Sequence, residues 1–197
     1  MPEVEGNEGV ADVFQKYGSE LKVVLDCTEI QTQMSSDLRA RKEFFSNYKQ
    51  RDTMKFRVGL APNLTVNFVS KAWGGQASDK RMTLDSEELL NALTLGSSVM
   101  WDRGFTLSKK LKERGVKLII PDFKGCNRSQ MTRRECENSQ SNAQARIHVE
   151  CIIQRIRTFH ILNRTVLLSM KDIMEQIFTV CAYLTNFQSP IVNPDSH

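Results

Sequence analysis

The 197-residue sequence lacks the features that would assign it to a membrane or secreted class. No apolar run approaches the roughly 20 residues that are needed to cross a bilayer. The opening MPEVEGNEGV is acidic and lacks the basic start and apolar stretch of a secretion signal. There are only five prolines, and no internal repeat or low-complexity tract is present. We therefore expect an intracellular protein with no membrane partner.

Paired metal-binding cysteines are also missing. The five cysteines are odd in number and widely spread, none forms a CxxC pair, and no two histidines are spaced i, i+4. This pattern disfavours a zinc site and predicts reduced thiols that act as small core residues.

Neither sign of charge is strongly in excess. The net charge is +4 and the pI is about 8.8, with 40% hydrophobic and 25% charged residues. This composition is typical of a soluble globular protein, and the length allows one domain with a proper core. The mild positive balance permits a polyanionic partner but does not require one.

Apolar patterning predicts a mixed α/β sheet with helices on its faces. Residues 21–25 indicate a short buried strand that ends on Asp26, and residues 54–68 alternate around the turn APNL as a hairpin does. Residues 97–101 predict another short strand, which ends on Asp102, and residues 116–121 predict one more. The predicted order is therefore typical of an open sheet with crossover helices.

Helix signals lie between and after these strands. Capping boxes start helices at Asp85 and at Thr132, and the second helix is expected to run from about 133 to 160. Gly115 is expected to end a basic helix. A last helix is predicted over 170–187, where five apolar residues follow 3- and 4-residue steps: Ile173, Ile177, Val180, Leu184 and Phe187. Residues 1–20 are predicted to form a tail or truncated remnant, residues 21–188 the domain, and residues 189–197 a C-terminal tail.

The long predicted helix carries a single acid among many bases. Between Asn138 and Lys171 the only carboxylate is Glu150. Helical geometry places it on the flank of an apolar face, on the same side as Arg146 and Arg157, and we expect it to be neither deeply buried nor freely solvated. The apolar face itself is expected to contain Ala145, Val149, Ile152, Ile153, Ile156 and His160. An ion pair of Glu150 with Arg146, which stabilises a helix by ~0.2–0.5 kcal/mol, is the simplest account of this acid.

Two strand-end aspartates add a functional interpretation. Asp26 and Asp102 each follow a buried strand, where open α/β sheets place ligand chemistry, although such an Asp often only forms a turn. If the strands are neighbours and the long helix packs across them, Asp26, Asp102 and Glu150 converge. Three carboxylates would need cations, and hard oxygen ligands select Mg²⁺ or Mn²⁺. Two such ions serve attack on a phosphodiester, and surrounding bases would contact nucleic-acid phosphates.

Several segments of the sequence resemble motifs of a known family. VVLDCTEI, SVMWDRGF and ARIHVECIIQRIRTFHIL resemble the three acidic motifs of the DDE superfamily endonucleases, with the Harbinger-type transposases and their THAP-associated relatives the nearest group. FFSNYKQRDTMKF and SKAWGGQASDK are similar to further motifs of that group, in the same order. The resemblance covers about residues 21–187.

The resemblance implies an RNase H-like fold and a metal-binding catalytic triad of Asp26, Asp102 and Glu150. It also implies a DNA endonuclease that uses Mg²⁺ or Mn²⁺ in a two-metal mechanism. Basic residues near the triad are expected to contact DNA: Arg103, Arg146, His148, Arg155 and Arg157. A DNA substrate would place the protein in the nucleus of a eukaryotic cell, with the cytoplasm as the alternative.

Other interpretations stay open. Full transposases of this kind carry a DNA-binding region ahead of the catalytic domain, whereas only about twenty residues precede it here. A domesticated, inactive DNA- or protein-binding derivative is therefore the alternative, and a homo-oligomer or a separate DNA-binding partner protein could complete it. A phosphatase-like use of Asp26 as nucleophile is disfavoured because Thr28 stands where a second acid is needed. Trp101 replaces a small residue of the family, and alternation predicts that it faces away from Asp102 into a core.

Overall fold

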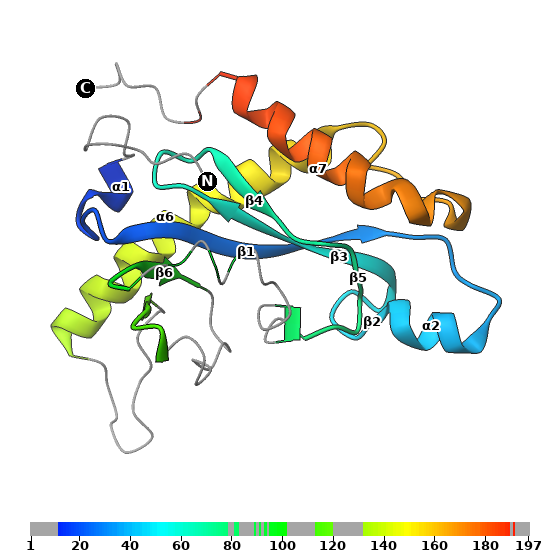
Figure 1. The fold of residues 1–197 in the computed structure, drawn as a ribbon, viewed down its shortest axis with the longest axis horizontal. Coiled ribbons are helices and arrows are strands. Elements are labelled where there is room, and N and C mark those ends of the chain that lie inside the picture. The colour runs from blue at the N-terminus through cyan, green and yellow to red at the C-terminus, as the bar shows by residue number, and fades with distance from the viewer. Residues whose placement is uncertain are drawn as a thin grey trace.

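A computed structural model shows that the fold is organised around one mixed sheet (Figure 1). The structure describes residues 12–78, 81–82, 89, 91, 93, 95–101, 113–119, 132–189 and 191. Within them the strand order is β2-β3-β1-β6-β7, and β4 and β5 also pair with β3. Parallel and antiparallel pairs occur together and helices pack on the sheet, which confirms the predicted α/β class and is compatible with an RNase H-like fold.

The antiparallel half of the sheet is centred on a long strand pair. Strand β1 (Leu21–Gln31) pairs from Val24 to its end with β3 (Arg51–Leu60). Strand β4 (Val66–Val69) returns against β3, so the predicted hairpin is confirmed. The short strands β2 (Phe45–Ser46) and β5 (Trp73–Gly74) also pair antiparallel with β3.

The parallel half lies on the other side of β1. Strand β6 (Ser98–Met100) runs parallel to β1, and β7 (Lys117–Ile119) runs parallel to β6. Gly115 has a φ of 65°, the left-handed conformation that favours glycine after a helix, as predicted. The helices expected from Asp85 and ahead of Gly115 fall largely on residues 79–80, 83–88 and 102–112, outside the described part of the chain.

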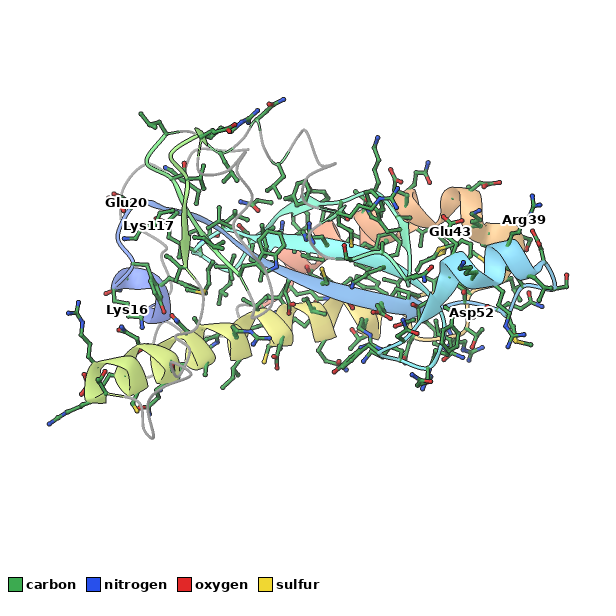
Figure 2. All side chains as sticks on the ribbon, turned by 90° about the horizontal axis from the view of Figure 1, so that it is seen from below. Lys16, Glu20, Arg39, Glu43, Asp52 and Lys117 are labelled. Carbon is green, nitrogen blue, oxygen red and sulfur yellow. The ribbon has the colours of Figure 1, made fainter. Side chains whose placement is uncertain are left out.

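The described helices are α1 (Asp12–Gln15), α2 (Leu38–Phe44), α6 (Arg133–Thr158) and α7 (Met174–Leu184), with 3-10 turns η1 (Leu168–Ile173) and η2 (Thr185–Phe187). The long helix predicted from about 133 and the last helix are confirmed. Figure 2 shows α6 along one side of the sheet, with Lys16 beside its N-terminal half and Asp52 near the opposite end. In the described residues, no helix combines the length and apolar character that a membrane span requires.

Two cores lie on opposite faces of the sheet. The larger contains Val24 and Ile30 of β1, alternate residues of β3, and the buried sides of α6 and α7. The smaller contains Val23 and Leu25 of β1 together with Leu89, Val99 and Trp101. Because successive strand residues point to opposite faces, this division tells which face each β1 side chain occupies.

The buried side of α7 is not the apolar stripe that the sequence periodicity marks. Met174, Phe178, Cys181 and Ala182 are buried, and Phe178 stacks on Phe56 of β3 with ring centroids 4.1 Å apart. The predicted apolar stripe lies on another side of the helix, where Val180 and Phe187 are 58% and 87% exposed. The helix is therefore apolar on two sides, and the stripe with 3- and 4-residue steps is not the side that packs in the core.

The cysteines follow the prediction only in part. The four within the described residues are free thiols, and Cys181 is buried in the larger core. Cys136 and Cys151 are exposed on α6, so the expectation that the cysteines serve as core residues is wrong for these two.

The glycine-rich motif that follows β4 allows a close approach of backbones. A Cβ at Gly74 would lie 2.4 Å from the carbonyl oxygen of Glu43, and a Cβ at Gly75 would lie 2.3 Å from Oγ1 of Thr53. The Gly75 amide also donates to the carbonyl of Thr53 at 3.0 Å. Two glycines are therefore required where β5 lies against α2 and β3.

Helix α1 and the turn after it are attached to the body of the protein. Phe14 is buried in the larger core, and the Tyr17 hydroxyl donates a hydrogen bond to Oδ1 of Asn142, which is itself buried. Burial raises the pKa of Tyr17 to about 12. The phenol is thus kept protonated in the folded state over a pH range in which it ionises in the unfolded chain.

This shift predicts a pH dependence of stability. Because the folded pKa lies above the unfolded value of 10.0, the stabilisation is complete below pH 10 and is lost as the pH rises towards 12. Tyr17 is only partly buried, so we expect a loss on the order of 1–2 kcal/mol. Urea unfolding at pH 9 to 12 should show a shallower decline for Tyr17→Phe than for the wild type. Parallel declines would contradict this assignment.

Candidate functional site

Asp26 lies within β1 and not at its end. The sequence predicts that the strand stops there, but β3 pairs with β1 as far as Gln31, and Thr28 and Ile30 continue the buried alternation. The prediction that the strand ends at Asp26 is therefore wrong for the edge of β1 that pairs with β3. The Asp26 carboxylate is half-buried, and its Oδ1 accepts the backbone N–H of Cys27 at 2.8 Å. This hydrogen bond fixes one oxygen of the carboxylate against the strand.

On its other edge, β1 pairs with β6, and this pairing ends before Asp26. The parallel pairing with β6 begins at Leu21 and Ser98 and ends at Val24 and Met100. Asp26 thus lies just beyond the last residue pair that joins the two strands. The condition that the strands of the first and second acidic motifs are neighbours is therefore met. Asp102 and Arg103 lie outside the described residues.

Asp26 and α6 occupy the same face of the sheet. Asp26 is two residues from Val24, so the two side chains leave β1 on one side. Val24 belongs to the larger core, together with Ala145, Val149 and Ile153 of α6. Figure 1 shows α6 crossing β1 obliquely. The acid on the strand and the helix that carries the third motif are therefore not separated by the sheet.

Glu150 is more exposed than predicted. Its side chain is 63% exposed, because Val149 and Ile153 take the side of α6 that faces the core. Its Oε1 lies 3.7 Å from Nη2 of Arg146 one turn earlier, and such an exposed pair stabilises the helix by only ~0.2–0.5 kcal/mol. The expected intermediate solvation is thus wrong, whereas the ion pair is present.

The predicted apolar face of α6 is otherwise confirmed. Ala145, Val149, Ile152, Ile153 and Ile156 are buried. His160 is exposed, because α6 ends at Thr158 and the residues after it no longer follow the helical repeat.

The basic residues of α6 divide between two flanks of the helix. At roughly 100° per residue, Arg146 and Arg157 share one flank with Glu150, and His148 and Arg155 lie on the other. Arg155 donates from Nη1 to the carbonyl of Ser189 at 2.5 Å. The Nδ1 atom of His148 is buried and has no hydrogen-bond partner among the described residues. One straight nucleic-acid backbone could therefore not contact all four residues.

One buried cation, Arg57, is not recognisable from the sequence. Arg57 is completely buried, and its guanidinium carbon lies 4.3 Å from the ring centroid of Trp101. Arg57 pairs with Cys27 across β1 and β3, so it occupies the face opposite to Asp26. The prediction that Trp101 fills a core is confirmed. Lys55 and Arg57 alternate with apolar residues along the hairpin, as charged residues on a solvent-exposed strand face do. The sequence therefore gives no sign that Arg57 is buried.

The described residues contain two of the three predicted carboxylates. Among them, no group of three or more His, Cys, Asp or Glu side chains is arranged to hold a metal ion. Asp26 and Glu150 both offer oxygen donors, which suit a hard divalent cation and not zinc. The donor chemistry of these two residues therefore fits magnesium or manganese.

Comparison with known proteins supports the same family as the motifs. A family model described as DDE superfamily endonuclease matches residues 25–186. The match begins one residue before Asp26, ends in η2, and includes Glu150. A search of the curated proteins found no match to the sequence.

Proposed function

Because the chain belongs to the DDE superfamily endonucleases, we propose that it is a divalent-metal-dependent DNA nuclease of transposase origin with Asp26, Asp102 and Glu150 as its catalytic carboxylates. The observation that carries the proposal is the parallel register of β1 and β6, in which Val24 is opposite Met100. Asp26 follows Val24 by two residues, and Asp102 follows Met100 by two. This matched spacing supports a shared site for both acids.

Glu150 would complete the site from helix α6. Its helix packs on the face of β1 that carries Asp26, and its exposed side chain is free to change rotamer at little cost, since the pair with Arg146 is weak. The three carboxylates would hold the cation or cations. When bound there, two Mg²⁺ or Mn²⁺ ions activate the attacking oxygen and stabilise the leaving oxygen of a phosphodiester.

The protein's own residues would bind and orient the DNA. Arg146 and Arg157 share the flank of Glu150, and guanidinium groups form strong, charge-assisted hydrogen bonds to phosphate oxygens. Arg103 directly follows Asp102 in the sequence and would contribute a further cation. His148 and Arg155 lie on the other flank and would contact DNA only if it wrapped around the helix. In a eukaryotic cell, a DNA substrate would place the protein in the nucleus.

A matched pair of substitutions on α6 tests the proposal. Glu137 and Glu150 are 62% and 63% exposed, and each pairs with an Arg one turn earlier. If Glu150 has only that helical role, Glu150→Gln and Glu137→Gln should behave alike. We expect Glu150→Gln to reduce nicking of supercoiled plasmid with Mg²⁺ or Mn²⁺ by at least ~10²-fold, a loss of about 2.7 kcal/mol of transition-state stabilisation. We expect Glu137→Gln to retain wild-type activity.

The alternative is an inactive derivative that binds DNA or a protein without cutting. The exposure of Glu150 and its contact with Arg146 favour this alternative, because a working ligand would be expected to point towards the other acids. Titration calorimetry with Mn²⁺ separates the two functions. A nuclease should bind Mn²⁺, and Glu150→Gln should weaken that binding. Equal plasmid nicking by the wild type and by both Glu variants would exclude the proposed catalytic role.

A further inference from the structure

Helix α7, with the last residue of η1 and the last residue of η2, presents an apolar stripe to the solvent. The stripe consists of Ile173, Ile177, Val180, Leu184 and Phe187. Four of these side chains are exposed by 46% or more, and only Ile177 is partly covered. The steps of four, three, four and three residues are those of a helix that packs against another helix in a coiled-coil manner. The stripe is distinct from the buried side of α7, where Phe178 stacks on Phe56.

The area of the stripe is large enough to have a consequence. Tyr183 adjoins it and is 40% exposed. An aromatic side chain covers on the order of 150–250 Å², and the aliphatic members of the stripe are smaller. Since most of these side chains are about half exposed, together they expose roughly 500 Å² of apolar surface, near the upper limit for the largest patch on a typical monomer. Two such stripes in contact would bury roughly 1,000 Å², which is about the lower bound for a specific interface.

Charge indicates what kind of partner the stripe accepts. From Ile173 to Gln188 the sequence contains one charged residue, Glu175. Its carboxylate accepts the backbone N–H of Ala72 at 3.2 Å, and Glu175 lies on the side of α7 away from the stripe. The stripe thus offers no charge to select a partner of opposite sign. It also offers none that would repel an identical surface, although the chain as a whole carries +4.

The order of side-chain sizes along the stripe is self-complementary. If two α7 helices cross antiparallel about a two-fold axis at Val180, Ile173 meets Phe187 of the second copy and Ile177 meets Leu184 of the second copy. Valine, the smallest of the five, falls at the crossing point, where two helices must approach most closely. Such an isologous contact buries both stripes completely and leaves no open end for a third copy.

From these features we infer that the occupant of the α7 stripe is a second copy of this chain, bound through antiparallel α7 helices. The inference does not depend on nuclease activity, because it uses none of the carboxylates. An interface at the lower size bound predicts a dimer that dissociates on dilution, with a Kd on the order of 1–100 µM.

Sedimentation equilibrium from about 1 µM to a few hundred µM tests this inference. The wild type should change from monomer to dimer across that range. Val180→Glu places a carboxylate at the two-fold axis next to its own copy, and should raise the Kd by at least tenfold. Gln154→Glu makes the same charge change on the exposed side of α6 and should leave the Kd unchanged.

A crosslinking experiment gives the geometry independently of stability. In a background with Cys126, Cys136 and Cys151 replaced by serine, Val180→Cys should form an intermolecular disulfide under mild oxidation, because the two copies of residue 180 meet at the axis. Gln154→Cys in the same background should not. A protein that stays monomeric at the highest concentration overturns the inference. So does a dimer that Val180→Glu leaves intact, or a wild-type monomer whose stripe binds only a different protein.

Discussion

Asp26→Asn is expected to abolish metal-dependent nicking while leaving the fold intact. The carboxylate lies just beyond the last pair between β1 and β6, on the face that α6 covers. Loss of its negative charge would remove a ligand for the cation, and we expect nicking to fall by about 10³-fold or more, equivalent to about 4 kcal/mol of transition-state stabilisation. Plasmid nicking with Mn²⁺ measures this directly.

The same substitution should barely affect stability. Oδ1 of Asp26 accepts the Cys27 N–H at 2.8 Å, and the amide oxygen of asparagine can accept the same hydrogen bond. We therefore expect the free energy of unfolding of Asp26→Asn to stay within about 0.5 kcal/mol of the wild type. Asp172→Asn, at an exposed position in η1, is the control for removing one negative charge. An Asp26→Asn variant with undiminished nicking would exclude the proposed catalytic centre.

Phe178→Ala is expected to cause the largest loss of stability. The ring is completely buried between α7 and the sheet and stacks on Phe56 at 4.1 Å with an interplanar angle of 7°. Truncation removes this contact and leaves a cavity, which together cost about 3–5 kcal/mol. Urea unfolding measures the difference, at a protein concentration low enough that any dimer has dissociated.

Phe187→Ala provides a control of the same chemistry. Phe187 lies only nine residues further along the chain but is 87% exposed. In the monomer we expect its truncation to change the free energy of unfolding by less than about 0.5 kcal/mol. If the two variants lost equal stability, the assignment of inner and outer sides to α7 would be wrong.

The sequence predicted those elements whose signals are local. The hairpin of β3 and β4, the long helix α6 and the left-handed Gly115 all follow from alternation, capping and the special conformations of glycine. The end of β1 could not be predicted, because the strand continues past Asp26 only through its pairing with β3, which is a contact between distant parts of the chain. For α7, both sides are apolar, so periodicity could not tell which one meets the sheet.

The sequence yields candidate residues for the site but not the environment of their side chains. Spacing and motif similarity selected Asp26 and Glu150 as candidate residues, and their role stays a prediction. The structure places the strand of Asp26 and the helix of Glu150 on the same face of the sheet. Neither the 63% exposure of Glu150 nor the burial of Arg57 could be read from the sequence. Both depend on which neighbours cover a side chain, and that is decided by packing across the sheet.

The attachment of Tyr17 to Asn142 determines where a fused module would be held. Asn142 precedes Glu150 by eight residues on α6, which corresponds to about 12 Å along the helix axis. A polypeptide joined ahead of Asp12 therefore reaches the body of the protein beside the helix that bears the third acid. A DNA-reading unit joined at that point would lie beside the proposed catalytic site. The carbonyl of Ser189 accepts a hydrogen bond from Arg155 of α6, so a unit joined after Ser189 would begin beside the same helix.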